Sequence, residues 1–121
     1  MNRDKIAEFY KKYELVEDDV FKHKHYLIIT RQGIEKIQAK ESIKITYDFV
    51  ESGGAGVIIK AYAIKGDVKI ETFGSASKDT SHNKYYAEMA EKRAMSRAVL
   101  KITGMYELGV FGEDESDDFK K

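Results

Sequence analysis

The stretch "VIIKAYAIKGDVKIETFG", from Val57 to Gly74, decides the fold. Its two halves, Val57 to Ile64 and Val68 to Gly74, are short runs rich in β-branched residues, and such runs are typical of strands. The "KGD" between them provides a tight turn with Gly66 at its centre. The stretch therefore predicts an antiparallel β-hairpin.

A third strand precedes this hairpin. In "KITYDFV" (Lys44 to Val50), apolar Ile45, Tyr47 and Phe49 alternate with polar residues, which predicts a half-buried strand. The "ESGGAG" that follows (residues 51–56) predicts a flexible connection. It is not expected to bind a nucleotide, because a Walker loop ends in Gly-Lys-Ser/Thr and a dinucleotide loop leads into a helix, whereas a strand follows here.

A long helix follows the strands. The stretch "HNKYYAEMAEKRAMSRAVLKITG" (His82 to Gly104) has a broad apolar arc rich in alanine and ends in glycine, a frequent helix C-cap. Alanines allow a close approach to a sheet. We therefore predict an α+β fold: an antiparallel meander of three to four strands with one long helix packed across it, a β-β-β-α core.

The remaining residues complete one domain. A short N-terminal helix is expected over residues 3–14, a polar break over residues 16–19, a strand from Lys24 to Thr30 and a short helix within residues 31–40. Residues 1–112 are predicted to form this domain and residues 113–121 a disordered acidic tail. The tail either docks on a protein partner through its acids and Phe119 or is a frayed, solubilising end.

The composition excludes several classes of function. The 121 residues include no cysteine, which rules out disulfides, thiolate metal sites and cysteine nucleophiles. No apolar run is long enough to cross a bilayer, and no secretory signal is visible, so we expect a cytoplasmic protein without a membrane partner. His23, His25 and His82 show no metal-ligand spacing, and no catalytic arrangement is found. We therefore predict no enzyme activity, no metal and no cofactor; a metal-dependent nuclease requires a carboxylate cluster that the sequence does not show.

The zero net charge conceals an uneven distribution. Residues 20–104 contain 15 basic and 9 acidic side chains, whereas both ends of the chain are acidic. A basic central segment suits a polyanionic partner, and ordinary surface charge is the alternative.

Cations also line the long helix. Arg93, Arg97 and Lys101 recur every four residues, which places them in one narrow sector over roughly 12 Å beside the apolar arc. Such a row can follow a nucleic-acid backbone; alternatively it is a solvated face on which Glu88 and Lys92 form a helix pair. The sequence leaves both interpretations open.

The choice of aromatic residues is uneven, with eight tyrosines and no tryptophan. Several lie on or beside the basic strands and helix, where base stacking would use them. Tyrosine is also a common residue on half-buried strand faces.

Three phrases together resemble a known family: "YLIITRQGIEKI", "VIIKAYAIKGDVKIETFGSAS" and "HNKYYAEMAEKRAMSRAVLKITGMYELG…EDESDDF". They resemble phage and prophage-type recombination proteins that share an A-E-x-R-A-x-x-R-A-(V/I) helix ending in glycine and a D-D-F-like acidic tail. The order strand–strand–strand–helix is similar to that of the single-strand annealing proteins related to eukaryotic Rad fifty-two.

The resemblance implies a homo-oligomeric ring or filament that binds single-stranded DNA along a basic groove. It implies backbone phosphate contacts from Lys92, Arg93, Arg97 and Lys101, with Ala94 and Ala98 as packing positions.

We therefore expect a non-enzymatic protein of phage type that binds or anneals single-stranded DNA in recombination or replication. Further phosphate contacts are expected from Lys60, Lys69 and Arg31, and stacking from a subset of Tyr47, Tyr62 and Tyr86. The alternative is a homo-oligomeric protein-interaction module without nucleic-acid binding, in which Arg93 and Arg97 pair with acids.

Overall fold

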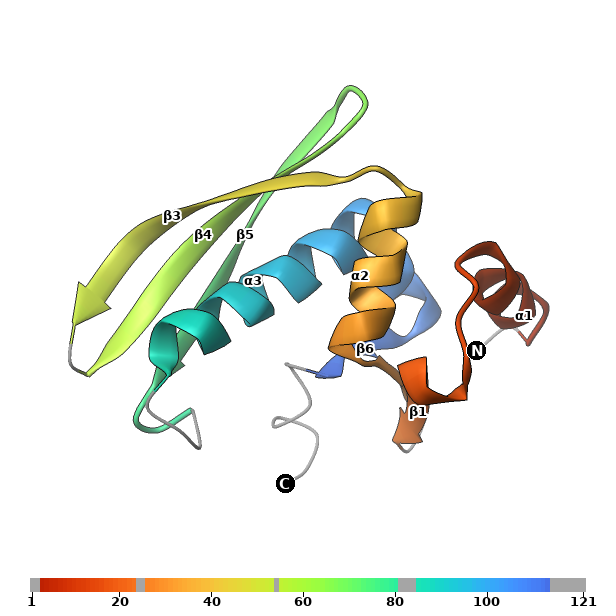
Figure 1. Cartoon of the computed structure of the whole chain (residues 1–121), viewed down its shortest axis with the longest axis horizontal. Coiled ribbons are helices and arrows are strands. Elements are labelled where there is room, and N and C mark those ends of the chain that lie inside the picture. The colour runs from red at the N-terminus through yellow and green to blue at the C-terminus, as the bar shows by residue number, and fades with distance from the viewer. Residues whose placement is uncertain (1–2, 24–25, 54, 81–84, 114–121) are drawn as a thin grey trace.

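The computed structural model describes residues 3–23, 26–53, 55–80 and 85–113 (Figure 1). It confirms the predicted α+β class. The main sheet contains three antiparallel strands in the order β3-β4-β5: β3 (Lys44–Gly53), β4 (Gly56–Lys65) and β5 (Val68–Ser77). Lys65 pairs with Val68, so Gly66 and Asp67 form a two-residue turn, and Gly66 has the positive φ of 60° that such turns require. The register of β3 against β4 shifts between Phe49 and Glu51 at a β-bulge.

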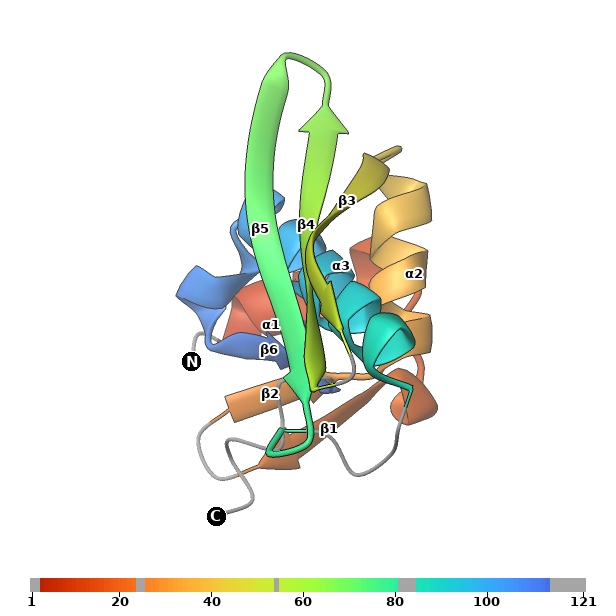
Figure 2. The ribbon, with the colours of Figure 1, turned by 90° about the vertical axis from the view of Figure 1, so that its left-hand side faces the viewer.

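The helix α3 (Tyr86–Ile102) lies across one face of this sheet. It packs chiefly on β5 and β4 (Figure 2). The approach is closest at Gly74, where an added Cβ would collide with the carbonyl oxygen of Ala90 and the amide nitrogen of Ala94. Thr72 donates a hydrogen bond of 2.8 Å to the carbonyl of Ala94 across the same contact. The predicted alanine face of the helix therefore does pack on the sheet.

A second sheet, which the sequence did not predict, contains β1 (Val20–His23), β2 (Tyr26–Ile29) and β6 (Val110–Gly112). The strand expected from Lys24 to Thr30 is β2, whose described part begins at Tyr26. β1 precedes that range, was not predicted, and pairs with β2 in the antiparallel direction. β6 then joins β2 in parallel. The short 3₁₀ helix η2 (Met105–Leu108) is flanked by Gly104 and Gly109, whose φ angles of 73° and 77° reverse the chain after α3.

α3 is consequently the central layer of the molecule. Its sheet-facing alanines lie against β4 and β5, while Ser96 and Leu100 on another side lie against Gly112 of β6. The helix α2 (Arg31–Lys40) also packs on α3, and α1 (Arg3–Lys12) lies near the N-terminus beside this layer (Figure 1). A helix covered on several sides has few positions left for exposed cations.

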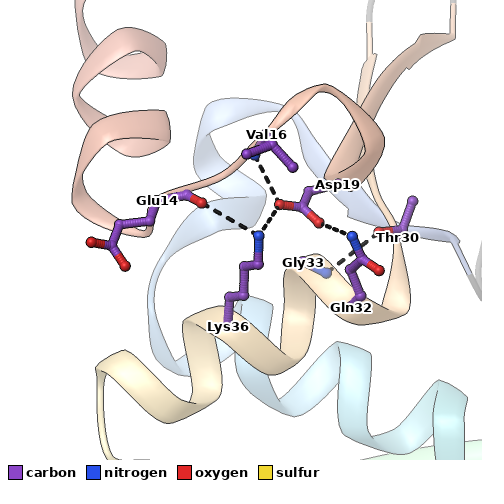
Figure 3. Close-up of polar contacts among 7 residues, drawn as sticks. All are labelled: Glu14, Val16, Asp19, Thr30, Gln32, Gly33 and Lys36. Atoms are coloured by element: carbon purple, nitrogen blue, oxygen red, sulfur yellow. Dashed lines mark hydrogen bonds and ion pairs between the residues drawn. The ribbon is translucent and has the colours of Figure 1, made fainter.

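A buried carboxylate joins the N-terminal segment to α2 (Figure 3). Asp19 ends the 3₁₀ helix η1 (Glu17–Asp19) and has no exposed surface. Its Oδ2 accepts hydrogen bonds from the Lys36 ammonium at 2.6 Å and the Val16 amide at 2.8 Å, and its Oδ1 accepts one from Gln32 at 2.6 Å. Burial alone would raise the pKa of Asp19, but these donors hold it below its ordinary value. The expected polar break, residues 16–19, is thus exposed at its first three residues but ends in a buried, fully bonded carboxylate.

Replacing Gly74 with alanine tests the close contact between sheet and helix. Because the new methyl group would overlap backbone atoms of α3, we expect Gly74→Ala to lower the free energy of unfolding by about 1–3 kcal/mol or more. Gly53→Ala is the matched control, since a Cβ there meets no atom within 4 Å. Urea unfolding followed by circular dichroism measures both; equal stability of the two variants would contradict the close contact.

Candidate nucleic-acid interface

The main sheet has one face packed on α3 and one that α3 does not cover (Figure 2). Strand alternation and the observed register place a mixed set of side chains on this second face, which we call the open face. Up to the bulge, its members are Lys44, Thr46, Asp48, Ile58, Lys60, Tyr62, Ile64, Lys69, Glu71, Phe73 and Ser75.

Lys60 is at the centre of the open face. Its ammonium lies 5.1 Å from the ring centroid of Tyr62 and 5.6 Å from that of Phe73, within the range of cation–π attraction. It also forms an ion pair of 3.1 Å with Glu71, and the hydrogen bond to this carboxylate raises the pKa of Lys60. A hydrogen bond to Asp48, followed by burial, raises the pKa of Tyr62. The two rings and the cation are therefore held together, with Phe73 still 49% exposed.

Three of the residues predicted from the sequence share the open face: Lys60, Tyr62 and Lys69. Phe73 is not among the residues predicted from the sequence, because every predicted stacking residue is a tyrosine. The alternation of Lys69, Glu71 and Phe73 along one strand was the available signal, since residues two apart lie on the same face.

Arg93 is not part of an exposed ridge, which corrects the expectation for the helix. It is only 6% exposed. Its guanidinium donates hydrogen bonds of 2.7 Å to the carbonyl of Ser75 and 2.6 Å to the carbonyl of Thr80. Arg93 thereby fastens the turn that follows β5 to α3, because each donor is directed at a backbone acceptor.

Arg97 has a similar backbone partner. It donates a hydrogen bond of 2.7 Å to the carbonyl of Phe73, two residues before Ser75. Four residues of an α-helix rise about 6 Å, and two residues of a strand extend about 6.7 Å, so the two repeats nearly match. The row of cations therefore follows the outer edge of β5, and the exposed Lys101 lies one step further along the helix.

The other predicted residues lie elsewhere. Tyr47 is half-buried on the α3 side of β3, where burial and then Glu91 raise its pKa while Arg31 opposes the shift. Arg31 begins α2 and forms an ion pair of 3.0 Å with Glu35. Tyr86 begins α3 and packs on the core, and Lys92 is partly exposed. The predicted residues thus do not line one groove.

The open face is nearly neutral before the bulge. Lys44, Lys60 and Lys69 face Asp48 and Glu71 on the same surface. Any polyanion bound there would be held by few ionic contacts.

Glu41 lies in a separate groove of about 380 Å³ beside α1. Its carboxylate, in a side chain 11% exposed, bonds Lys65 at 2.9 Å, Lys12 at 3.1 Å and the Tyr13 hydroxyl at 2.8 Å. Lys65 first, and then Tyr13 and Lys12, outweigh burial and lower the pKa of Glu41 to about 2. Through these three partners the carboxylate links α1, the end of α2 and β4.

Within the described ranges, no three histidine or acidic side chains come together as a metal site, and no helix is long and apolar enough to cross a membrane. His25, His82 and residues 114–121 of the predicted tail lie outside those ranges, and the structure does not describe the side chain of His23.

Comparison of the sequence with known proteins gives no match, either to a protein-family model or to a curated protein. The resemblance to annealing proteins therefore stays a prediction.

Removing the Arg93 guanidinium tests its structural role. We expect Arg93→Met to lower the free energy of unfolding by about 2 kcal/mol, because two backbone carbonyl acceptors lose a charged donor. Lys101→Met is the control on the same side of the helix and should change stability by no more than about 0.5 kcal/mol. If Arg93→Met is as stable as Lys101→Met in urea unfolding, Arg93 is not a structural fastener.

The link formed by Glu41 predicts a pH dependence of stability. The pKa of Glu41 is lowered from 4.5 to about 2 in the folded chain. The contribution of Glu41 to the free energy of unfolding is therefore complete above pH 4.5 and is lost as the pH falls towards about 2. Glu41→Gln should therefore be less stable than the wild type at about pH 6, with a smaller difference at about pH 3. Urea unfolding at both pH values measures this; Glu35→Gln, on an exposed ion pair, is the control. A difference that is the same at both pH values contradicts the assignment.

Proposed function

We propose that this protein binds single-stranded DNA, without sequence preference, across the open face. The observation that carries the proposal is the pair of rings on either side of Lys60. Aromatic side chains on a sheet surface offer bases a stacking platform, and a lysine between them offers a cation to the phosphates. The open face combines both.

The register supports two stacking positions. Lys60 pairs with Phe73 and Tyr62 pairs with Glu71, so Tyr62 and Phe73 are diagonal neighbours on adjacent strands. Diagonal neighbours are about 7–8 Å apart, close enough for one strand of nucleic acid to contact both rings. Lys69 lies beyond Tyr62 along the hairpin and Lys44 lies on β3, so cations flank the rings on two sides.

The helix cations have a smaller part in this proposal than in the sequence-based hypothesis. Arg93 is committed to backbone carbonyls and is left out. Arg97 binds the carbonyl of Phe73, which places it at the edge of the open face next to one of the two rings. Lys101 is exposed on the same helix row. A strand that leaves Phe73 across the edge of β5 would meet these two cations.

The proposed role is non-enzymatic: binding, and annealing of complementary strands, in phage-type recombination or replication in the cytoplasm. The alternative, a homo-oligomeric module, is favoured by a different surface, the exposed strand β3.

Removing both rings tests the proposal. We expect Tyr62→Ala combined with Phe73→Ala to raise the dissociation constant for a fluorescein-labelled oligothymidylate at least about tenfold, since each stacked base contributes about 1–3 kcal/mol. Fluorescence anisotropy measures it at two salt concentrations. With about three lysines available, the slope of log K against log salt should be about −2.

Phe21→Ala is the matched control, because Phe21 is also an exposed phenylalanine but lies on β1 of the other sheet. It should bind like the wild type. If the double variant is folded by circular dichroism and still binds DNA as tightly as the wild type, the open face is not the site.

A further inference from the structure

The two outer strands of the main sheet differ in whether their outward backbone groups already have hydrogen-bond partners. β5 is one outer strand, and Arg93 and Arg97 occupy the carbonyls of Ser75 and Phe73 along it. β3 is the other outer strand. Among the described residues, no loop, cap or side chain outside the sheet donates to or accepts from the backbone of Lys44–Gly53. One edge is therefore covered and the other is open to pairing.

β3 is also the strand with the most exposed side chains. All six residues from Asp48 to Gly53 are exposed, including Phe49 at 65% and Val50 at 56%. α3 packs mainly on β5 and β4, and α2 packs on α3, so these helices leave much of β3 uncovered (Figure 2). An exposed edge strand with large apolar side chains attracts another strand unless something covers it.

The turn between β4 and β5 fixes which backbone groups point outward. A two-residue turn makes Lys65 and Val68 a hydrogen-bonded pair, and hydrogen-bonded pairs then alternate along both ladders. On β5 this alternation directs the carbonyls of Phe73 and Ser75 outward, where Arg97 and Arg93 indeed bind them. On β3 it directs the amide and carbonyl groups of Ile45 and Tyr47 outward.

We propose that a second copy of this chain pairs with β3 in the antiparallel direction, with Thr46 opposite Thr46 on the two-fold axis. In that register Ile45 of each chain exchanges hydrogen bonds with Tyr47 of the other. Lys44 of each chain is then opposite Asp48 of the other, in non-hydrogen-bonded pairs where side chains are closest. Two ion pairs form on the open face at once.

Charge selects this register over its neighbours. Only shifts by two residues keep the same side chains on the same face. One such shift, in either direction, removes both ion pairs by placing Thr46 opposite Lys44 or opposite Asp48. A second shift places Lys44 opposite Lys44 or Asp48 opposite Asp48, and like charges directly opposite destabilise a pair.

The proposed pair covers exposed apolar surface and is closed. The paired segment ends where Lys44 lies opposite Asp48, because the amide and carbonyl of Ile43 are already bonded to Gln38. The exposed Phe49 of each chain then lies next to the other chain just beyond the ion pairs, and the two open faces become one continuous surface. A ring or filament built by strand pairing would need β3 to join β5 of the next chain. Arg93 and Arg97 occupy that edge, so the geometry favours a two-fold pair over the ring or filament expected from the sequence.

A disulfide test measures the register directly. Thr46→Cys introduces the sole thiol of the chain. Opposite residues in a non-hydrogen-bonded pair have Cα atoms about 4.5 Å apart, within the range of disulfides. We expect Thr46→Cys to form a covalent dimer rapidly under mild oxidation on non-reducing gels. The control is Ser75→Cys, which is also exposed and on the open face but on β5. Equal crosslinking of the two variants, or none in either, overturns the proposal.

Charge exchange provides a second measurement that does not depend on a new thiol. Lys44→Glu or Asp48→Lys alone should raise the dimer dissociation constant about tenfold or more, because two attractive pairs become repulsive. The combination of both substitutions should restore dimerisation, as measured by sedimentation equilibrium without DNA. Loss of dimer in the combined variant, or no change in either single variant, contradicts the proposed register. Because no DNA is present, the result is independent of the proposed function.

Discussion

The contact of α3 with β5 at Gly74 determines how the rest of the molecule is arranged. Because this position has no side chain, the backbone of the helix at Ala90 and Ala94 approaches the strand directly. That proximity allows Thr72 to reach the carbonyl of Ala94 and allows two arginines to reach carbonyls on the outer edge of β5. A larger residue at this point would move the helix outward and separate all of these groups together.

The same contact explains the asymmetry of the sheet. A helix that lies close to β5 and β4 contacts β3 much less, so β3 is exposed along most of its length. Aliphatic residues of β4 such as Ile59 fill the layer between sheet and helix, while Phe49 on β3 does not. The covered edge at β5 and the uncovered edge at β3 thus both result from the packing of α3 on β5 and β4. The edge at β3 either stays exposed or is covered by another molecule.

Local patterns in the sequence predicted the elements whose partners are close in the chain. The meander and the long helix follow from alternation, turn chemistry and helical periodicity. The second sheet did not follow, because β6 contains three residues and pairs in parallel with β2, more than 80 residues earlier. Nothing in "VFG" specifies so distant a partner, and the strand is too short for alternation to be visible. Likewise, the burial of Asp19 could not be recognised, because Lys36 and Gln32 on a later helix complete its hydrogen bonds.

The arginine row shows why spacing alone does not determine function. A cation every four residues along a helix forms a regular row that could follow the phosphates of a nucleic acid. The same spacing also matches the distance between every second carbonyl along a strand edge. The sequence cannot choose between these acceptors, because the strand carbonyls lie 18 and 24 residues before the arginines that bind them. Desolvation favours the carbonyls: an arginine at the position of Arg93 is almost fully buried, and a buried guanidinium is stable only where fixed acceptors surround it. Exposed groups with no fixed acceptor are therefore the better guide to a binding surface. In this protein such groups are the rings on the open face and the uncovered backbone of β3, and not the arginines of the helix.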